Sequence, residues 1–322
     1  MGHPARRARR HGEHPHHRGS ERMSLKIATA PISWGVSEVE GWGYQLPPER
    51  VLAEMRELGF DATELGAQGF LPPAPEDKAT RLAEFGMTAI GSFVPVIAHQ
   101  PGTDPLPRIE QELRDYAASG ATVLVVCADS EQTGYDAQRE PLTDEQWSTL
   151  FANLDRITEA AAAVGVTATL HPHVGTVVET KDDVDAVLAG STIPFCFDTG
   201  HLFLGGTDPV VFAAEHSDRI AYMHLKDVSL EGMHRVARGE ISYFDAIKAD
   251  LLYRPVGQGD VDIRAILQSM VDADFDGWIV LEQDKVVLEE PEPGAGPIED
   301  ARASVQYVRA LVAELEAAEA TR

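Results

Sequence analysis

The sequence predicts a single-domain α/β fold, a (β/α)8 TIM barrel. From Lys26 onward, short apolar segments alternate with amphipathic helical patterns, and eight such units occupy about 290 residues, which is the count that this barrel requires. The first apolar segment runs into APISWG, which lacks the glycine-rich phosphate-binding turn of a doubly wound open sheet. The open sheet is therefore the less favoured α/β alternative.

Each predicted strand is a short run of apolar and β-branched residues. The eight runs lie at residues 26–32, 61–65, 87–93, 121–126, 166–171, 194–198, 219–226 and 277–282. Helical patterns follow them, with clear examples at 48–59, 108–120, 144–165, 262–274 and 304–318. Three of these patterns end at a glycine, which tolerates the left-handed backbone that commonly closes a helix. These glycines are Gly59, Gly120 and Gly165.

A long connection interrupts the repeat after the seventh strand. Residues 228–261 separate this strand from its helix, which is well beyond the length of an ordinary loop. Within the connection, residues 240–252 predict a helix, and the turn-rich sequence RPVGQGD (254–260) follows. Because the connection leaves the carboxyl end of a barrel strand, we expect it to overhang the barrel mouth and to contribute substrate contacts.

Charge and composition exclude several classes of partner. The net charge of -25 repels phosphate backbones and anionic lipid surfaces, so we expect neither a nucleic-acid nor a membrane partner. The chain has no run of about 18 apolar residues that could span a bilayer. Cys127 and Cys196 lie in apolar runs, which predicts buried, reduced thiols and a cytoplasmic protein.

The first residues differ in composition from the rest of the chain. They are rich in Arg and His, and they lack the apolar segment of a secretory signal peptide. We therefore predict a disordered basic leader over residues 1–24 and a catalytic barrel domain over residues 25–322.

Ionisable side chains gather where the predicted strands end. In a TIM barrel, the carboxyl ends of the strands form the active site. The candidates come from the second strand, from the fifth to the eighth strands, and from the turns that follow them. They are Glu64, His171, His173, Asp198, His201, His224, Lys226 and Glu282.

Three of these side chains come from adjacent strands. Asp198, His224 and Glu282 could converge on one cation, together with either His171 or His173. Oxygen and nitrogen ligands without a thiolate suit Mn²⁺, Co²⁺, Fe²⁺ or Zn²⁺. A single histidine at a strand end is more often a hydrogen-bonded core residue. However, burying this many ionisable groups without a cation would be costly, which favours the metal site.

Several segments spread along the chain resemble one group of enzymes. They are IATAPISW (27–34), GFDATELG (59–66), LHPHVGT (170–176), FDTGH (197–201), RIAYMHLKDV (219–228), VGQGDVDI (256–263) and DGWIVLEQD (276–284). With these motifs, the sequence resembles the xylose-isomerase-like superfamily of sugar phosphate isomerases and epimerases. Within that superfamily, it resembles the inosose dehydratase group more closely.

The resemblance implies a metal-dependent hydro-lyase of myo-inositol catabolism. Such an enzyme removes water from an inosose (2-keto-myo-inositol) and forms a cyclic trihydroxy-dione through a metal-stabilised enediolate. The resemblance implies Mn²⁺ or Co²⁺ as the metal, with Zn²⁺ or Fe²⁺ as alternatives, and it allows glutathione as a further cofactor. The expected partner is a small polyol or keto-sugar, and self-association into a homo-oligomer is left open.

With this resemblance, we expect specific roles for the candidate residues. The metal ligands would be His171, Asp198, His224 and Glu282. The catalytic residues would be His171, His173, Lys226 and Glu282, and the substrate-binding residues would be Glu64, Trp34 and His201.

Three of these roles have alternatives. His171 stands where many superfamily members carry a glutamate, so it is either a ligand or a base. Lys226 either protonates the leaving hydroxyl or forms a salt bridge. Trp34, like Trp42, could pack against a sugar ring or be buried in the core.

Three other functions are alternatives to dehydration. An isomerase or epimerase would use the same metal site and the same enediolate. An abasic-site endonuclease is disfavoured because the corresponding region reads GQGDVDI, without a histidine, and because the chain is strongly acidic. A barrel that binds a sugar without turnover is disfavoured by the complete set of candidate ligands.

Overall fold

The computed structural model describes residues 25–137, 140–319 and 321. The predicted leader over residues 1–24 lies outside the described residues. All eight predicted strands are present, and every strand pair in the main sheet is parallel. The strands of this sheet are β1 (Lys26–Thr29), β2 (Ala62–Thr63), β3 (Thr88–Ala89), β4 (Gly91–Val96), β5 (Val123–Ala128), β6 (Thr167–Leu170), β7 (Phe195–Asp198), β8 (Ile220–Leu225) and β11 (Trp278–Leu281).

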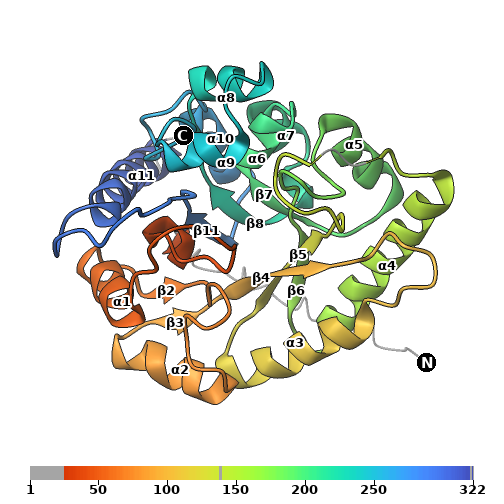
Figure 1. Cartoon of the computed structure of the whole chain (residues 1–322), viewed down its shortest axis with the longest axis horizontal. Coiled ribbons are helices and arrows are strands. Elements are labelled where there is room, and N and C mark those ends of the chain that lie inside the picture. Colours follow the sequence, from red (N-terminus) through yellow and green to blue (C-terminus); the bar gives the residue numbers. More distant parts are fainter. Residues whose placement is uncertain (1–24, 138–139, 320, 322) are drawn as a thin grey trace, which may run out of the picture.

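The sheet closes on itself through the third barrel strand (Figure 1). The strand order is β3-β2-β1-β11-β8-β7-β6-β5-β4, and only Ile90 separates the two end strands in the chain. The amide of Ile90 donates to Thr63 O (3.1 Å), while its carbonyl accepts from Thr122 N (3.0 Å), so the two halves of this strand bond to opposite neighbours. A glycine follows at residue 91 because a Cβ there would lie 2.4 Å from Val123 O. The prediction of an eight-stranded barrel is therefore confirmed.

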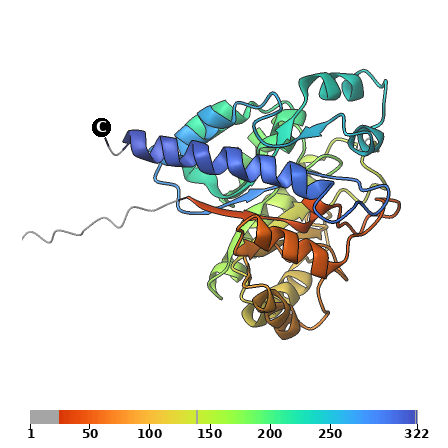
Figure 2. The ribbon, with the colours of Figure 1, turned by 90° about the vertical axis from the view of Figure 1, so that its left-hand side faces the viewer.

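A ring of helices surrounds the sheet (Figures 1 and 2). The predicted glycine stops are confirmed, because the φ angles of Gly59, Gly120 and Gly165 are 80°, 82° and 77°. Thr143 begins one helix with a capping box that includes Gln146. The helices of the ring are α1 (Pro48–Glu57), α2 (Pro75–Glu84), α3 (Leu106–Ser119), α4 (Asp144–Ala162), α5 (Lys181–Gly190), α6 (Thr199–Leu204), α7 (Pro209–Glu215), α10 (Ile263–Asp272) and α11 (Pro297–Glu319), with 3-10 turns at Pro31–Trp34 and Ser217–Arg219.

Apolar side chains fill two layers of the fold. The larger layer lies between the sheet and the surrounding helices. The smaller one fills the barrel interior and includes Ala28, Ala62, Val125, Tyr222 and Val280. The polar strand ends therefore lie above a packed floor.

Among the residues that the structure describes, no helix is both long and apolar enough to cross a membrane.

The long connection after β8 folds into a small unit of its own. Its elements are β9 (Asp227–Val228), α8 (Leu230–Ala237), α9 (Tyr243–Lys248) and β10 (Tyr253–Arg254), and the two strands pair antiparallel. The helix predicted over residues 240–252 is shorter than expected. It begins after its N-cap Ser242 and cannot continue past Asp250, whose φ of 54° is left-handed. The helix α8 was not predicted.

One buried carboxylate fixes the end of this connection. Asp227 accepts hydrogen bonds from the backbone amides of Val228 (3.0 Å), Gly257 (2.8 Å), Gly259 (2.9 Å) and Val261 (3.1 Å). These four bonds replace the water that a buried carboxylate would otherwise require. The turn-rich segment is thereby tied to the end of β8.

Candidate active site

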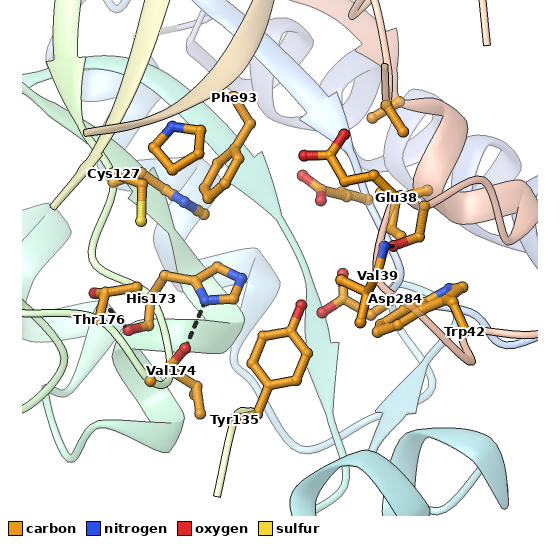
Figure 3. Close-up of a pocket in the computed structure, with 18 of the residues that line it drawn as sticks. Glu38, Val39, Trp42, Phe93, Cys127, Tyr135, His173, Val174, Thr176 and Asp284 are labelled. Atoms are coloured by element: carbon orange, nitrogen blue, oxygen red, sulfur yellow. Dashed lines mark hydrogen bonds between the residues drawn. The ribbon is translucent and has the colours of Figure 1, made fainter. Parts of the chain in front are cut away.

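A cavity of about 450 Å³ opens at the carboxyl ends of the barrel strands. Figure 3 shows its walls, which come from the loops after β1, β5 and β6 and from the ends of several strands. Aromatic side chains form one part of the lining, and histidines and carboxylates form the other. The lining includes Glu38, Trp42, Glu64, Phe93, Asp129, Tyr135, His171, His173, His224, Glu282 and Asp284.

The predicted metal ligands converge at the floor of this cavity. Asp198 Oδ2 lies 3.2 Å from His171 Nε2 and 3.6 Å from His224 Nδ1. On its other side, His224 Nδ1 lies 2.6 Å from Glu282 Oε2. The sheet register explains this meeting, because Asp198 and His224 are paired residues of neighbouring strands. The predicted convergence of Asp198, His224 and Glu282 is confirmed.

The atoms at this floor fit a divalent cation. Donor atoms bound to one ion at about 2.0–2.2 Å lie roughly 3 Å apart, which is close to the separations found here. His224 Nδ1 and Glu282 Oε2 are both buried, and neither makes a hydrogen bond of acceptable geometry with a described residue despite their proximity. These two atoms instead share a 2.6 Å ion pair, and a cation coordinated by both would replace the proton in that pair.

Neighbouring groups orient two of these ligands. His224 Nε2 lies 2.8 Å from Glu64 Oε1, which leaves Nδ1 facing the centre. Glu64 also accepts a hydrogen bond from Tyr222 (2.9 Å). Asp198 Oδ1 accepts from the amides of Gly200 and His201 at the start of α6, so its Oδ2 is the atom that faces the centre. Such outer contacts hold a metal ligand in place.

The local charges favour ionised carboxylates at this floor. Burial opposes the ionisation of Glu282, but His224, which is protonated where no metal ion is bound to it, and Lys226 outweigh this effect and lower the pKa of Glu282 to about 2. Burial likewise opposes the ionisation of Asp198, and Lys226 and His201 hold its pKa well below the usual range. Both carboxylates can therefore act as anionic ligands.

Lys226 lies beneath the cavity and not in its wall. Its Nζ is 3.0 Å from Asp284 Oδ1, 3.3 Å from Asp198 Oδ2 and 3.4 Å from Glu282 Oε1, and the side chain is only 1% exposed. It also donates to His201 Nε2 (3.0 Å). Of its two predicted roles, the structure shows the salt bridge. Lys226 is not among the residues that line the cavity, so its expected role as a proton donor to the substrate remains a prediction.

His173 has the geometry of a general base. Its Nδ1 donates to the carbonyl of Val174 (2.8 Å), so Nε2 carries the lone pair and points toward the cavity centre (Figure 3). Burial, reinforced by His171 and Lys226, lowers the pKa of His173 to about 3. The ring is therefore neutral near pH 7 with a free lone pair on Nε2, and the low pKa makes it a weak base.

Two predicted substrate-binding residues do not line the cavity. Trp34 is fully buried, and its Nε1 donates to Glu54 of α1 (2.9 Å), because the 3-10 turn after β1 directs the ring outward. His201 lies behind His173, with ring centroids 3.8 Å apart. The expectation that Trp34 and His201 contact the substrate is therefore corrected, whereas Glu64 does line the cavity.

Sequence reasoning assigned no role to two lining residues. Asp284 faces the cavity, and burial raises its pKa to about 6 although Lys226 opposes the shift. Its position two residues after Glu282 already placed it on the same face. Tyr135, from the loop after β5, points its hydroxyl into the cavity (Figure 3). No pattern in the sequence marks this tyrosine.

The long connection supports the cavity without lining it. The ring of Trp42 packs on Phe244 (5.5 Å between centroids), and Tyr135 packs on Tyr243 (5.3 Å). Among the described residues, none between 228 and 261 lines the cavity. The connection thus overhangs the mouth as predicted. The expected direct substrate contacts are not found, and the connection instead supports two of the aromatic rings that line the cavity.

Comparison with known proteins agrees with this geometry. The family model described as xylose isomerase-like TIM barrel matches residues 52–311. The chain belongs to the xylose isomerase-like TIM barrel family. Within this family, the chain is similar to proteins named inosose dehydratase. The one from Geobacillus kaustophilus is 30% identical over 312 residues, which cover 92% of this chain and 97% of that protein. The expected family resemblance is confirmed.

Other known proteins are also similar to this chain. The rhizopine catabolism protein MocC of Rhizobium meliloti is 31% identical over 276 residues, which cover 82% of each chain. A solved L-ribulose 3-epimerase superposes with a TM-score of 0.64 at 17% identity and covers 92% of this chain and 97% of its own. The IOLI protein, solved with a bound zinc atom, gives a TM-score of 0.62 at 14% identity over 90% of this chain and 99% of its own. These two structures show the shared fold.

Proposed function

We propose that this xylose isomerase-like protein dehydrates an inosose to a cyclic trihydroxy-dione. The observation that carries the proposal is the meeting of Asp198, His224 and Glu282 below a cavity into which neutral His173 points. The similarity to inosose dehydratases over nearly the whole chain supports the same reaction. The protein would then be a hydro-lyase, and we propose that it works in the cytoplasm.

We assign His171, Asp198, His224 and Glu282 as the residues that hold a divalent ion, with Mn²⁺ or Co²⁺ as the proposed metal. Their donor atoms are one carboxylate oxygen each from Asp198 and Glu282 and one nitrogen from each histidine. When bound, such an ion supplies Lewis acidity toward a ketone oxygen and its neighbouring hydroxyl. Of the two expected roles of His171, we therefore propose the ligand and not the base.

The remaining chemistry belongs to the cavity wall. His173 Nε2 takes the proton from the carbon next to the ketone, and the electron pair of that C–H bond becomes the enediolate. The hydroxyl on the next carbon departs with its bonding electrons and takes the proton from the His173 imidazolium, which releases water and restores neutral His173, and the resulting enol rearranges to the dione. Asp284 and Tyr135 line the cavity beside His173, with 5.9 Å between the ring centroids of Tyr135 and His173, and are placed to hydrogen-bond the departing hydroxyl (Figure 3).

The lining also restricts the charge of the substrate. Five carboxylates line the cavity, whereas no Lys or Arg does so within the described residues. A phosphate or carboxylate on the part of the substrate remote from the metal would therefore meet repulsion without a cationic side chain to pair with. An uncharged polyol ketone such as inosose fits this wall.

An epimerase is the second candidate, because solved epimerases share the fold. It would remove the same proton and return it to the other face without loss of water. Incubation of the metal-loaded protein with scyllo-inosose in D₂O separates the two reactions. Dehydration gives the absorbance of the dione, whereas epimerisation gives a deuterated inosose and no dione.

The same assay tests the metal site and the cofactors. Loading with Mn²⁺, Co²⁺, Zn²⁺ or Fe²⁺, each with and without glutathione, identifies the active ion and any need for the thiol. The variants Asp198→Ala and Glu282→Ala should bind metal weakly and form no dione. Retention of both metal and activity in these two variants would overturn the proposed function.

A further inference from the structure

A second group of potential ligands lies beside the first. His173, His201 and Asp284 each offer an atom within 4.8 Å of the others, and none of them belongs to the set His171, Asp198, His224 and Glu282. His201 and Asp284 are buried, and His201 Nδ1 has no hydrogen-bond partner among the described residues. By composition, two imidazoles and a carboxylate suit a divalent ion as well as the first set does.

The ammonium of Lys226 lies at this second group. Its Nζ is 3.0 Å from His201 Nε2 and 3.0 Å from Asp284 Oδ1. It also contacts Asp198 and Glu282 of the first set, at 3.3 and 3.4 Å. A positive charge that belongs to the chain itself therefore lies between the two groups.

The fold keeps Lys226 in this position. Thr199 Oγ1 donates to the carbonyl of Lys226 (2.6 Å) and accepts from its amide (2.9 Å). A Cβ at Gly200 would lie 2.7 Å from Lys226 Cβ, so α6 packs directly against the side chain. The ring of Tyr253 lies 5.5 Å from Nζ on another side. The ammonium cannot leave without disturbing these elements.

The charge of the surrounding carboxylates limits how many cations can bind beside the Lys226 ammonium. Three carboxylates, those of Asp198, Glu282 and Asp284, lie within 3.4 Å of the Lys226 Nζ. One divalent ion and one ammonium neutralise them, whereas two divalent ions and the ammonium would leave an excess of buried positive charge.

We propose that Lys226 is a built-in cation that occupies the second ligand group and limits the centre to one divalent ion. This inference rests on the metal centre of the proposed function and concerns how many ions it holds. Lys226 is then a positioning residue, because its ammonium holds Asp284 and His201 in the places that a second ion would claim. Without it, His173, His201 and Asp284 become a vacant site beside the first ion.

The test is the Mn²⁺ stoichiometry of the full-length protein with Lys226 changed to Met. We expect one equivalent in the wild-type protein and two in Lys226→Met, measured by metal analysis after gel filtration. Two ions about 3.5–4 Å apart should also give an exchange-coupled electron paramagnetic resonance spectrum, in contrast to the isolated six-line signal of the wild type. If the Met variant fails to fold, Lys226→Gln, which keeps a hydrogen-bond donor for Asp284, should likewise bind two equivalents of Mn²⁺.

Two controls make the result specific. Lys285→Met removes a half-buried ammonium that pairs with two aspartates, Asp250 and Asp300, and not with the proposed ligands, and this variant should keep one equivalent of Mn²⁺. The double variant Lys226→Met with Asp284→Asn also removes a ligand of the second group, so it should again bind one equivalent of Mn²⁺. Two equivalents of Mn²⁺ in the wild type, or one equivalent in both Lys226→Met and Lys226→Gln, would overturn the proposed role of Lys226 but not the metal centre. No bound Mn²⁺ in the wild type overturns the metal centre itself.

Discussion

Oε1 of Glu64 lies 2.8 Å from Nε2 of His224, on the side of the imidazole ring that faces away from the metal centre. The carboxylate comes from the residue after β2 and the histidine from β8, so two distant parts of the chain set one tautomer. With its Nε2 proton held by Glu64, His224 presents the lone pair of Nδ1 to Asp198 and Glu282.

Replacement of Glu64 by Gln should weaken metal binding by about 10- to 100-fold, because the amide holds the His224 tautomer less strongly than the carboxylate does. Competition against a metal-sensitive dye measures the change. Glu54→Gln is the matched control, since Glu54 bonds Trp34 and Arg50 outside the cavity and should leave metal affinity unchanged. Equal affinity in the Glu64 variant and the wild type would remove the orienting role.

The two histidines after β6 should separate into different roles. His171→Gln should lose metal affinity, because Nε2 of His171 lies in the ligand set. His173→Gln should keep the metal but lose about 10²- to 10⁴-fold in kcat/KM, because it lacks the proton-accepting nitrogen. Metal analysis and steady-state kinetics on the same samples decide the point. The assignment fails if the His173 variant loses metal while the His171 variant keeps it.

Removal of the metal should lower the stability of the fold. A ligand present at 100 times its Kd stabilises the native state by about 2.7 kcal/mol, which corresponds to a Tm increase of roughly 5 °C for a domain of this size. We therefore expect a chelator to lower the Tm of the wild type by such an amount in a thermal unfolding scan. Asp198→Ala, which lacks one ligand, should unfold at the same temperature with and without chelator.

The two tryptophans near the first loop should respond differently to substitution. Trp34→Phe removes the buried hydrogen bond to Glu54 and should cost about 1–2 kcal/mol of unfolding free energy without a change in KM. Trp42→Phe alters a lining ring and its bond to Lys285 O, so it should raise KM several-fold. Denaturant unfolding and kinetics of both variants check this. A raised KM in Trp34→Phe with an unchanged KM in Trp42→Phe would indicate that Trp34 contacts the substrate after all.

Barrel and metal ligands could be predicted because both depend on short-range patterns. Apolar runs mark each strand, and alternation along a strand decides which residues face inward. Asp198, His224 and Glu282 follow from this rule, since each stands at the end of a strand. Asp284 obeys the same alternation.

Other parts of the site depend on contacts between distant segments. Tyr135 reaches the cavity because Tyr243, more than a hundred residues later, packs on its ring and donates its backbone amide to Asp136 (2.7 Å). Trp34 fails to reach it because a 3-10 turn closed by Gly35 (φ 78°) rotates the ring toward α1. Alternation applied to Lys226 gave its face correctly, but only the distances to carboxylates show that it is ion-paired.

The interruption of the third strand at Ile90 also bears on how copies of this chain could associate. Because β3 and β4 bond to opposite neighbours, the main sheet has no row of unpaired backbone groups along a free border. A second molecule therefore cannot extend this sheet by adding a strand to it. Within the described part of the chain, the surfaces left for a homo-oligomer include the side chains of the helical exterior and the small β9–β10 ribbon.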